Sequence, residues 1–239
     1  MRRNTLLLAA VASFAMAGCT RANDDPAFDA KVRAYLLAHP EVIQEAVEKL
    51  QEQRDQASAA KAKIALQSDR QALERDPRDF VANPGGRITV TEFYDYRCPH
   101  CINAAPAVLK LIHDNPDVRF VFKEMPIFGA VSEHAARTAI AVKASGGNYL
   151  GLYQTLMSTH GLNDEAVDKI ARAGGVDPAK TEQGPLRAAA DAQIADVHKL
   201  ASALDIEGTP SFIIGDTLVP GEDMDAVRAA IAKAKAGKG

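Results

Sequence analysis

Two cysteines, Cys98 and Cys101, stand three positions apart at the junction of two different sequence patterns. Residues 88–94 are apolar or β-branched, which predicts a strand, and residues 102–113 have the apolar spacing of a helix. A Cys-x-x-Cys at such a junction places Cys98 at the helix N-terminus and Cys101 one turn later on the same face. The chain must therefore fold so that a strand runs directly into a helix at the two sulfurs.

This position gives Cys98 a distinct chemistry. Unpaired backbone N–H groups and the positive end of the helix dipole stabilise an anion, so the pattern predicts a Cys98 thiolate near neutral pH. Pro99 suits the first helical turn, where its missing N–H costs nothing, and a protonated His100 adds a second positive charge. We expect an oxidising Cys98–Cys101 disulfide, with Cys98 as the more exposed nucleophile and Cys101 as the resolving thiol.

Three other interpretations of the cysteine pair are weaker. A structural zinc site needs about four ligands, and the chain has one further cysteine, the distant Cys19. Covalent haem attachment needs a histidine directly after the second cysteine, where this chain has Ile102. An inert structural disulfide that closes so short a loop would gain little chain entropy. The spacing therefore favours a redox-active pair.

Two separate segments resemble one known family. The sequence from Glu92 to Cys101, Glu-Phe-Tyr-Asp-Tyr-Arg-Cys-Pro-His-Cys, resembles the active-site segment of the DsbA family of thioredoxin-fold oxidoreductases. Residues 208–212, Gly-Thr-Pro-Ser-Phe, resemble the loop whose cis-proline faces the cysteines in that superfamily. The resemblance covers about residues 80 to 236. It implies an α/β thioredoxin fold with a DsbA-type helical insertion at about residues 131–204.

The resemblance also assigns roles outside the cysteine pair. It implies a cis Thr209–Pro210 peptide beside the sulfurs, and the exposed backbone at Thr209 could pair with an extended substrate strand. It further implies that Glu92 is a buried acid that passes a proton to Cys101. A carboxylate beneath a dithiol would have a raised pKa and could act as a base, although alternation with Phe93 leaves a solvent-facing Glu92 as the alternative. Glu124 is a second candidate.

Five other histidines lack a partner motif and are expected to be neutral surface residues. They are His39, His113, His134, His160 and His198.

The region before this domain has a helical pattern. Apolar residues from Phe28 to Leu36 recur at helical spacing, and a second helix opens at Pro40. The apolar stripe of that helix comprises Val42, Ile43, Ala46, Val47 and Leu50, and Ile43, Leu50, Ala57 and Ile64 keep a seven-residue spacing. Because this stripe needs a partner outside the thioredoxin core, residues 27–75 predict an oligomerisation segment rather than a solvated helix.

The segment from Tyr35 to Ile43 resembles the N-terminal helix of ScsC-like proteins, the suppressor of copper sensitivity group. That resemblance implies a trimer that acts as a disulfide isomerase, and a link to copper tolerance. The turn-rich stretch 76–86 then predicts a hinge, followed by the thioredoxin domain at residues 80–237.

Inside the domain, the pattern predicts a parallel βαβ unit and a helical block. Residues 118–123 alternate as a second strand after the helix that follows Cys101. Residues 132–204 read as helical throughout, with Ser132 and Asn163 as N-caps. Residues 211–215 and 217–219 predict a hairpin, and residues 223–235 a closing helix.

The N-terminus predicts export. Arg2 and Arg3 precede an apolar run at residues 6–16 that is too short to anchor the chain in a membrane. Cleavage after Ala17 would leave a soluble periplasmic protein. Residues 16–19, Met-Ala-Gly-Cys, also resemble a bacterial lipobox, which would make residues 1–18 a lipoprotein signal and Cys19 the lipidated first residue. Both outcomes stay open.

These observations predict a periplasmic thiol–disulfide oxidoreductase. The net charge of −3 and the pI near 6.1 give no indication of a nucleic-acid partner. The expected partners are cysteine-containing exported proteins, a membrane redox partner and further copies of this chain. No cofactor beyond the redox disulfide is required. The leading function is an oligomeric disulfide isomerase. The alternatives are a monomeric DsbA-like oxidase and a copper-tolerance protein that binds Cu(I) through Cys98 and Cys101.

Overall fold

A computed structural model describes residues 25–237, except for the side chains of residues 54–59 and 61–63. The predicted signal peptide and the lipidation site at Cys19 lie outside the described residues. Within the described range, no helix is both long and apolar enough to span a bilayer.

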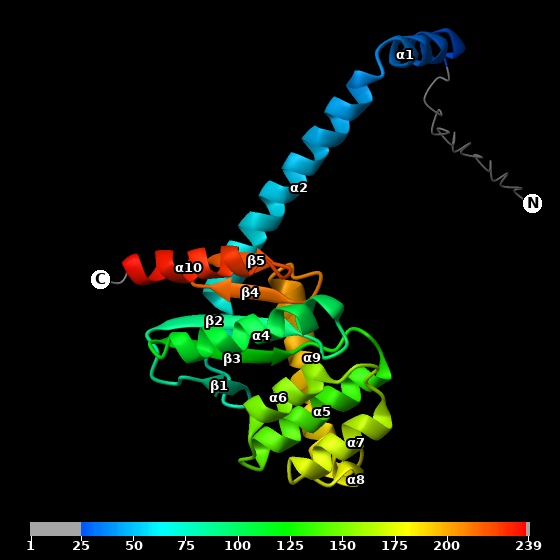
Figure 1. The fold of residues 1–239 in the computed structure, drawn as a ribbon. Coiled ribbons are helices and arrows are strands. Elements are labelled where there is room, and N and C mark those ends of the chain that lie inside the picture. Colours follow the sequence, from blue (N-terminus) through cyan, green and yellow to red (C-terminus); the bar gives the residue numbers. More distant parts are fainter. Residues whose placement is uncertain (1–24, 238–239) are drawn as a thin grey trace, which may run out of the picture. The chain divides into compact units, whose positions relative to one another are not determined.

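The described residues divide into two compact units, residues 25–54 and residues 55–237. Figure 1 shows their elements. The helices are α1 Pro26–Ala38, α2 Glu41–Ser68, α3 Arg70–Glu74, α4 Pro99–Asp114, α5 Ala130–Ala144, α6 Tyr149–Ser158, α7 Asp164–Ala173, α8 Pro178–Thr181, α9 Gly184–Ala203 and α10 Met224–Ala236. The strands are β1 Phe80–Ala82, β2 Ile88–Tyr94, β3 Val118–Glu124, β4 Ser211–Ile214 and β5 Thr217–Pro220.

The described part of the first unit is helical, and none of the α1 side chains is buried. Asp25 caps α1 by accepting hydrogen bonds from the backbone N–H groups of Ala27 and Phe28, and Pro26 occupies the first turn. Large apolar side chains stay in solvent, and the exposed fraction is 62% for Phe28, 53% for Ile43 and 60% for Val47. The predicted apolar stripe is therefore present and uncovered in the single chain.

The second unit is built on a five-stranded sheet with the order β1-β3-β2-β4-β5 (Figure 1). Strands β2 and β3 are parallel and are connected by α4, which confirms the predicted βαβ unit. Strand β4 pairs antiparallel with β2 and with β5, which confirms the predicted hairpin. Gly215 takes a φ of 59° in its turn, a conformation that glycine adopts without strain.

The stretch 76–86 is more than the hinge that its turn-rich composition predicted. Phe80–Ala82 form the edge strand β1, antiparallel to β3. Gly86 closes this connection because a Cβ there would lie 2.3 Å from the backbone N of Arg119. Three residues carry too little pattern to predict a strand on their own, and pairing with β3 decides their conformation.

Each face of the sheet packs against its own apolar cluster. Val90, Tyr94 and Phe122 point to one side, where α4, α5, α6 and α10 cover them. Phe93 and Ile213 point to the other side, where Leu66, Leu73 and residues of α9 cover them. Because both faces are covered, every residue of β2 is buried.

The second unit takes in more of the N-terminal helical region than predicted. We expected the helical segment to reach residue 75, yet the second compact unit begins at Asp55. Ala65, Leu66 and Leu73 belong to the apolar cluster under the sheet. The end of α2 and all of α3 are therefore part of the sheet-containing unit.

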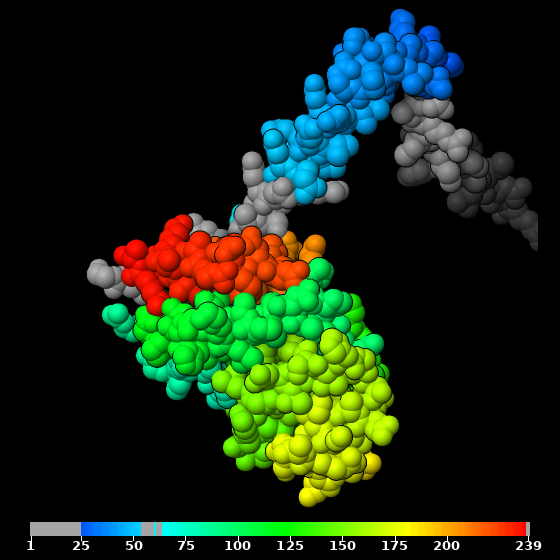
Figure 2. Space-filling view, in the orientation of Figure 1, coloured from blue at the N-terminus to red at the C-terminus, as the bar shows by residue number. Residues whose placement is uncertain are grey.

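Helices α5 to α9 form the predicted insertion between β3 and β4, and Figure 2 shows it, in green to yellow, packed directly against the sheet region. Asn163 caps α7 as predicted, since its side chain accepts from the N–H of Ala166. The Ser132 prediction is wrong, because α5 starts at Ala130 and the Ser132 hydroxyl donates to Asp95 instead. The closing helix α10 is capped by Asp223.

Candidate functional site

The two thiols lie at the junction that follows β2 and begins α4. Cys98 occupies the N-cap position and Pro99 the first turn, while Cys101 lies one turn further along. Both cysteines are reduced in this structure. The backbone N–H of Cys98 donates to the carbonyl of Asp95 across 3.2 Å, which closes the turn between strand and helix.

Asp95, which the sequence analysis did not single out, holds this turn in place. It is buried, and its carboxylate accepts from the backbone N–H groups of Arg97, Ile127 and Phe128 and from the hydroxyl of Ser132, at 2.6 to 3.0 Å. A carboxylate saturated by four donors is a rigid bridge between the segment before Cys98 and the segment after β3. The local signal was an aspartate just past a buried strand, typical of an Asx-turn.

The loop with the cis Thr209–Pro210 peptide faces Cys98. The Cys98 Sγ lies 3.1 Å from the carbonyl oxygen of Thr209 and donates to it in the thiol form. Cys98 is the more exposed of the two cysteines, as predicted, but both are buried, with 1% of Cys98 and 0% of Cys101 reaching solvent. The Thr209 backbone lies against Cys98 and keeps its exposure small.

The surroundings of Cys98 favour its thiolate. A hydrogen bond from the Cys101 thiol makes the largest contribution and, with the Thr209 side chain and the backbone N–H groups of Cys101 and His100, lowers the pKa of Cys98 to about 5 against the opposing effect of burial. The Thr209 hydroxyl has no other partner among the described residues, so it is free to donate to the sulfur. The thiolate expected from helix position alone is thus stabilised by specific donors.

Cys101 has the opposite environment. Burial raises the pKa of its thiol far above the ordinary value, and the hydrogen bond that it donates to Cys98 raises the pKa further. The pair therefore shares one negative charge, located on Cys98, while Cys101 holds its proton. This asymmetry favours a thiolate at Cys98 and a thiol at Cys101.

The surroundings of His100 favour its charged form, as predicted, and include an acidic partner that the sequence did not reveal. Its imidazole is largely exposed and lies 3.1 Å from Glu222, at the end of the β5–α10 connection. The hydrogen bond to Glu222 raises the pKa of His100 and so favours the imidazolium. What His100 donates directly to the Cys98 sulfur is its backbone N–H. Glu222 was missed because 122 residues separate it from His100 in the sequence.

Glu92 faces the core rather than solvent. It is 2% exposed, and the hydroxyl of Tyr153 donates to its Oε1 across 3.3 Å. Its Oε2 has no hydrogen-bond partner among the described residues. Burial raises the pKa of Glu92 to about 8, against the opposing effect of the Tyr153 bond. The Glu92 charge also raises the pKa of Cys101, so the two groups sense each other.

Glu124, the second candidate acid, lies in a cluster of tyrosines on the same sheet face. Its Oε1 accepts from the hydroxyls of Tyr94, Tyr96 and Tyr149 at 2.5 to 3.0 Å. Burial raises the pKa of Glu124 to about 8, although these three bonds lower it. The structure thus brings two buried carboxyl groups behind the thiols.

One of the predicted surface histidines is buried. His134 in α5 lies in the insertion, with Nδ1 3.0 Å from Asp164 and Nε2 3.3 Å from Asp168. The helical spacing of α5 did not reveal which of its faces α7 would cover. His39, His113 and His160 are exposed as predicted, and His198 is half-buried.

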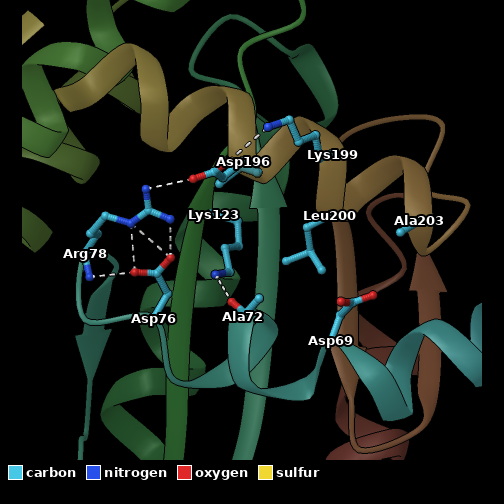
Figure 3. A pocket seen from close by; sticks show the side chains of 10 residues that line it. Asp69, Ala72, Asp76, Arg78, Lys123, Asp196, Lys199, Leu200 and Ala203 are labelled. Carbon is cyan, nitrogen blue, oxygen red and sulfur yellow. Dashed lines mark hydrogen bonds and ion pairs between the residues drawn. The ribbon is translucent and has the colours of Figure 1, made fainter. Parts of the chain in front are cut away.

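A hollow of about 400 Å³ lies on the opposite face of the sheet, away from the thiols (Figure 3). Figure 3 shows Arg78 bridging Asp76 and Asp196 across its rim, and Lys123 reaching the carbonyl of Ala72. Nothing in its lining belongs to the thiol site. In the described part of the chain, no group of three or more His, Cys, Asp or Glu side chains could hold a metal ion.

Two family models match the chain. The model of the DSBA-like thioredoxin domain matches residues 89–232, and the model of the N-terminal domain of the copper resistance protein ScsC matches residues 26–57. The first spans the thiol site and the insertion, and the second spans α1 and the first part of α2.

Solved structures agree with this assignment. A thioredoxin-like oxidoreductase from Silicibacter pomeroyi is 38% identical, with a TM-score of 0.64, and the match covers 70% of this chain and 97% of that one. ScsC from Proteus mirabilis in a transitional conformation is 26% identical, with a TM-score of 0.64, and the match covers 89% and 97%. The fold is the DsbA-like thioredoxin fold.

Curated relatives include a much longer protein. The chain is 30% identical over 175 residues to the Na(+)/H(+) antiporter NhaA 1 of Salinispora arenicola, and this match covers 68% of this chain. The chain spans about a quarter of the length of the antiporters that it matches, 26% and 25%.

Proposed function

The chain belongs to the DsbA family of thiol–disulfide oxidoreductases, with an N-terminal domain of the ScsC type, and we propose that it works in the periplasm as an oligomeric isomerase of wrongly paired disulfides. The observation that carries the chemistry is the asymmetry of the thiol pair. One sulfur is stabilised as a thiolate at the start of α4, and the other is buried one turn away with its proton retained.

This asymmetry supports a two-step exchange. The Cys98 thiolate attacks a substrate disulfide, a bond forms between Cys98 and one substrate sulfur, and the other substrate sulfur leaves with the electron pair. Another thiolate of the same substrate then attacks the substrate sulfur of this mixed disulfide and releases Cys98. The substrate is left with a rearranged disulfide. If no correct thiolate arrives, Cys101 gives up its proton and attacks Cys98, the enzyme disulfide forms, and the substrate leaves as a thiol. Cys101 thereby frees a stalled substrate.

The loop at Thr209 supports the handling of extended substrates. Its backbone lies beside the nucleophile, as the contact between the Thr209 carbonyl and the Cys98 sulfur shows. We propose that an unfolded chain pairs with this backbone as an additional strand, because main-chain hydrogen bonds accept any sequence. Such binding suits an enzyme that acts on many exported proteins. The enzyme would need a membrane redox partner to return its thiol pair to the reduced or oxidised form.

The exposed stripe of α1 and α2 supports oligomerisation. Phe28, Ile43 and Val47 expose more than half of their surface. Soluble monomers rarely leave such a row of large apolar side chains in water, because burying each one is worth about 1.5–3 kcal/mol. We propose that copies of this chain cover the stripe, as a trimer, and so present several thiol sites to one substrate.

Export is proposed from the N-terminal sequence. Arg2, Arg3 and the apolar run after them are typical of a bacterial signal, and a periplasmic location would keep the protein among its substrates. Whether the mature protein is free or held by a lipid on Cys19 decides its distance from the membrane. Labelling with a radioactive fatty acid, with Cys19→Ala as control, separates the two.

The isomerase proposal is tested with a scrambled ribonuclease and the intact mature protein. We expect recovery of ribonuclease activity and an oligomer by light scattering. The double substitution Ile43→Glu with Val47→Glu should give a monomer that still oxidises a reduced dithiol peptide but loses most of the recovery. Glu45→Gln, an exposed polar change on the same helix, is the matched control. Full isomerisation by the monomer would refute the oligomeric isomerase, and rapid oxidation without recovery would favour the DsbA-like oxidase.

Binding of Cu(I) is a second candidate, favoured by the two adjacent thiols, which are soft ligands. Competition against a Cu(I) chelator, with Cys98→Ser as the variant, provides the test. Loss of binding in the variant assigns the metal to this pair, and unchanged binding excludes the pair as the copper site.

A further inference from the structure

Behind the thiols lie two carboxyl groups without counter-ions. Glu92 on β2 and Glu124 on β3 point to the same side of the sheet, because the register pairs Glu92 with Phe122 and Tyr94 with Glu124. Strand geometry places their Cα atoms about 8 Å apart. Among the described residues, neither carboxyl forms an ion pair with a cation. This is unusual for buried acids, which are normally paired.

The two acids are bound almost entirely through tyrosine hydroxyls. Glu124 receives three, from Tyr94, Tyr96 and Tyr149, all on its Oε1. Glu92 receives one, from Tyr153. In each case the Oε2 has no hydrogen-bond partner in the described part of the chain. A charged carboxylate would leave that oxygen desolvated and uncompensated, so the geometry disfavours two negative charges on this face of the sheet.

The tyrosine rings connect the two acids physically. The ring of Tyr153 packs edge-on against Tyr94 with centroids 5.3 Å apart, while its hydroxyl reaches Glu92. The hydroxyl of Tyr94 reaches Glu124, at 2.6 Å. Each acid therefore accepts a hydrogen bond from a tyrosine whose ring packs against a tyrosine bound to the other acid.

The charged and titratable groups around this cluster come from every element that packs on it. Tyr94 and Glu92 come from β2, and Tyr96 and Asp95 from the turn that follows it. Cys101 comes from α4, and Tyr149 and Tyr153 come from α6. Glu124 raises the pKa of Glu92, and Asp95 raises that of Glu124, so negative charges on this face oppose one another. Such coupled acids lose their protons in two steps that belong to the pair.

We propose that Glu124 is a positioning residue for proton transfer at Cys101, and that its charge is coupled to that of Glu92 within one buried cluster of carboxyl and tyrosine hydroxyl groups. This inference rests on the proposed thiol–disulfide exchange. In the resolving step the Cys101 thiol gives its proton to the Glu92 carboxylate. The Cys101 sulfur bonds to Cys98, the bond from Cys98 to the substrate breaks, and the substrate sulfur leaves with the electron pair.

Glu124 acts in this step through its charge state. When Glu124 is ionised, Glu92 holds its proton more tightly. Once Glu92 has lost that proton, it is a stronger base towards Cys101. When Glu124 is neutral, Glu92 ionises at lower pH. The Glu124 carboxyl thus sets the pH range in which the Glu92 carboxylate is available to take the proton of Cys101.

The test uses one equivalent of the aromatic disulfide dithiobisnitrobenzoate with the intact reduced protein. Attack by Cys98 releases a first coloured thiolate, and attack by Cys101 on the mixed disulfide releases a second. The rate of the first release against pH reports the ionisation of Cys98. The rate of the second reports proton removal from Cys101, and we expect it to rise with pH more gradually than a single-proton curve because two coupled acids titrate.

In Glu124→Gln we expect the second rate to follow a single-proton curve whose midpoint lies about one pH unit lower, from a like charge removed at this distance. The first rate should keep its profile. Tyr149→Phe, which removes one hydroxyl donor and keeps the ring, should shift the second midpoint in the same direction by less. Asp79→Asn, a buried acid on the other face of the sheet, is the control for a general loss of stability.

An unchanged second profile in both Glu124→Gln and Tyr149→Phe would overturn the proposal and leave Glu124 a structural residue. A parallel shift in Asp79→Asn would also overturn it, because the effect would then follow stability. If the parent protein releases the first thiolate but no second, Cys101 does not resolve. That result would remove the proposed exchange chemistry itself rather than the role of Glu124 alone.

Discussion

Lys123 and Glu124 are consecutive residues of β3, and both are buried, but they face opposite sides of the sheet. Lys123 forms an ion pair with Asp79 and donates to the carbonyl of Ala72 across 2.6 Å. Glu124 lies among tyrosine hydroxyls with no cation beside it. The Lys123 ammonium is thus paired with a carboxylate, whereas the surroundings of Glu124 favour its neutral form.

The comparison shows what each face does. On the Lys123 side, side chains satisfy the last carbonyls of α3: Lys123 takes that of Ala72, and the hydroxyl of Thr91 takes that of Leu73, at 3.3 Å. These bonds fasten the start of the second unit to the sheet, beside the hollow in Figure 3. On the Glu124 side, neither Glu92 nor Glu124 forms an ion pair within the part of the chain that the structure describes. Glu92 lies close enough to Cys101 for its charge to raise the pKa of that thiol, and Glu124 lies further along the same face of the sheet.

Breaking the matched pair should have the largest effect. Lys123→Met leaves Asp79 buried without its cation, and we expect the free energy of unfolding in urea to fall by about 3–5 kcal/mol. Replacing both partners, as Lys123→Met with Asp79→Leu, should restore more than half of that loss, because two apolar groups need no compensation. A loss below about 1 kcal/mol in the single variant would show that the pair does not hold α3 to the sheet.

Neutralising a buried acid on the Glu124 side of the sheet should raise the free energy of unfolding rather than lower it. Glu92 has its pKa raised from 4.5 to about 8, so the fold favours its protonated form. Its contribution to stability is complete below its unfolded-state pKa and is lost as the pH rises through the folded-state value. Glu92→Gln should therefore raise the free energy of unfolding at pH 8 by about 1–3 kcal/mol and change it little at pH 4.

The ionisation of Cys98 changes stability with pH in the opposite direction. Because the parent and Glu92→Gln both carry Cys98, the difference between their free energies of unfolding isolates the contribution of Glu92. The pKa of Cys98 is lowered from 9.0 to about 5, so its contribution is complete above the unfolded-state pKa and is lost as the pH falls through 5. Urea titrations of the reduced parent and of Glu92→Gln at several pH values provide the measurement. A difference that does not grow with pH would contradict the assignment of a neutral Glu92.

The smallest effect is expected at the exposed pair of His100 and Glu222. Glu222→Gln removes the acceptor that raises the pKa of His100, so the imidazole near Cys98 loses charge at neutral pH. Since the pair is solvent-exposed, the titration midpoint of Cys98 should rise by less than about half a pH unit. Thiolate absorbance reports the midpoint, with Asp225→Asn as an exposed control. A rise of more than one unit would make this pair a main determinant of the thiolate.

The parts of the site that were predicted are those encoded by short spacing. Cys98 and Cys101 are three residues apart, and Pro210 stands in a recognisable loop, so local sequence was sufficient. The support for the thiolate was not predictable in this way. Asp95 acts through the loop after β3 and Glu222 through the loop before α10, and both contacts exist only after distant segments have packed.

The same reason explains the errors in the fold. The edge strand Phe80–Ala82 depends on β3 for its conformation, and the burial of His134 depends on α7. The extension of the second unit to Asp55 depends on the apolar surface under the sheet, which a helical pattern alone does not reveal. Periodicity identified the elements, and pairing between them decided which residues became buried.

The central claim is that the fold holds Cys98 as a thiolate while Cys101 keeps its proton. The most direct measurement is the ultraviolet absorbance of the thiolate in the reduced protein as the pH is raised, with Cys98→Ser as the control. We predict an ionisation with a midpoint near pH 5 that is absent from the control, and no ionisation of Cys101 below pH 9. A Cys98 that stays protonated up to pH 8 or above would contradict the account.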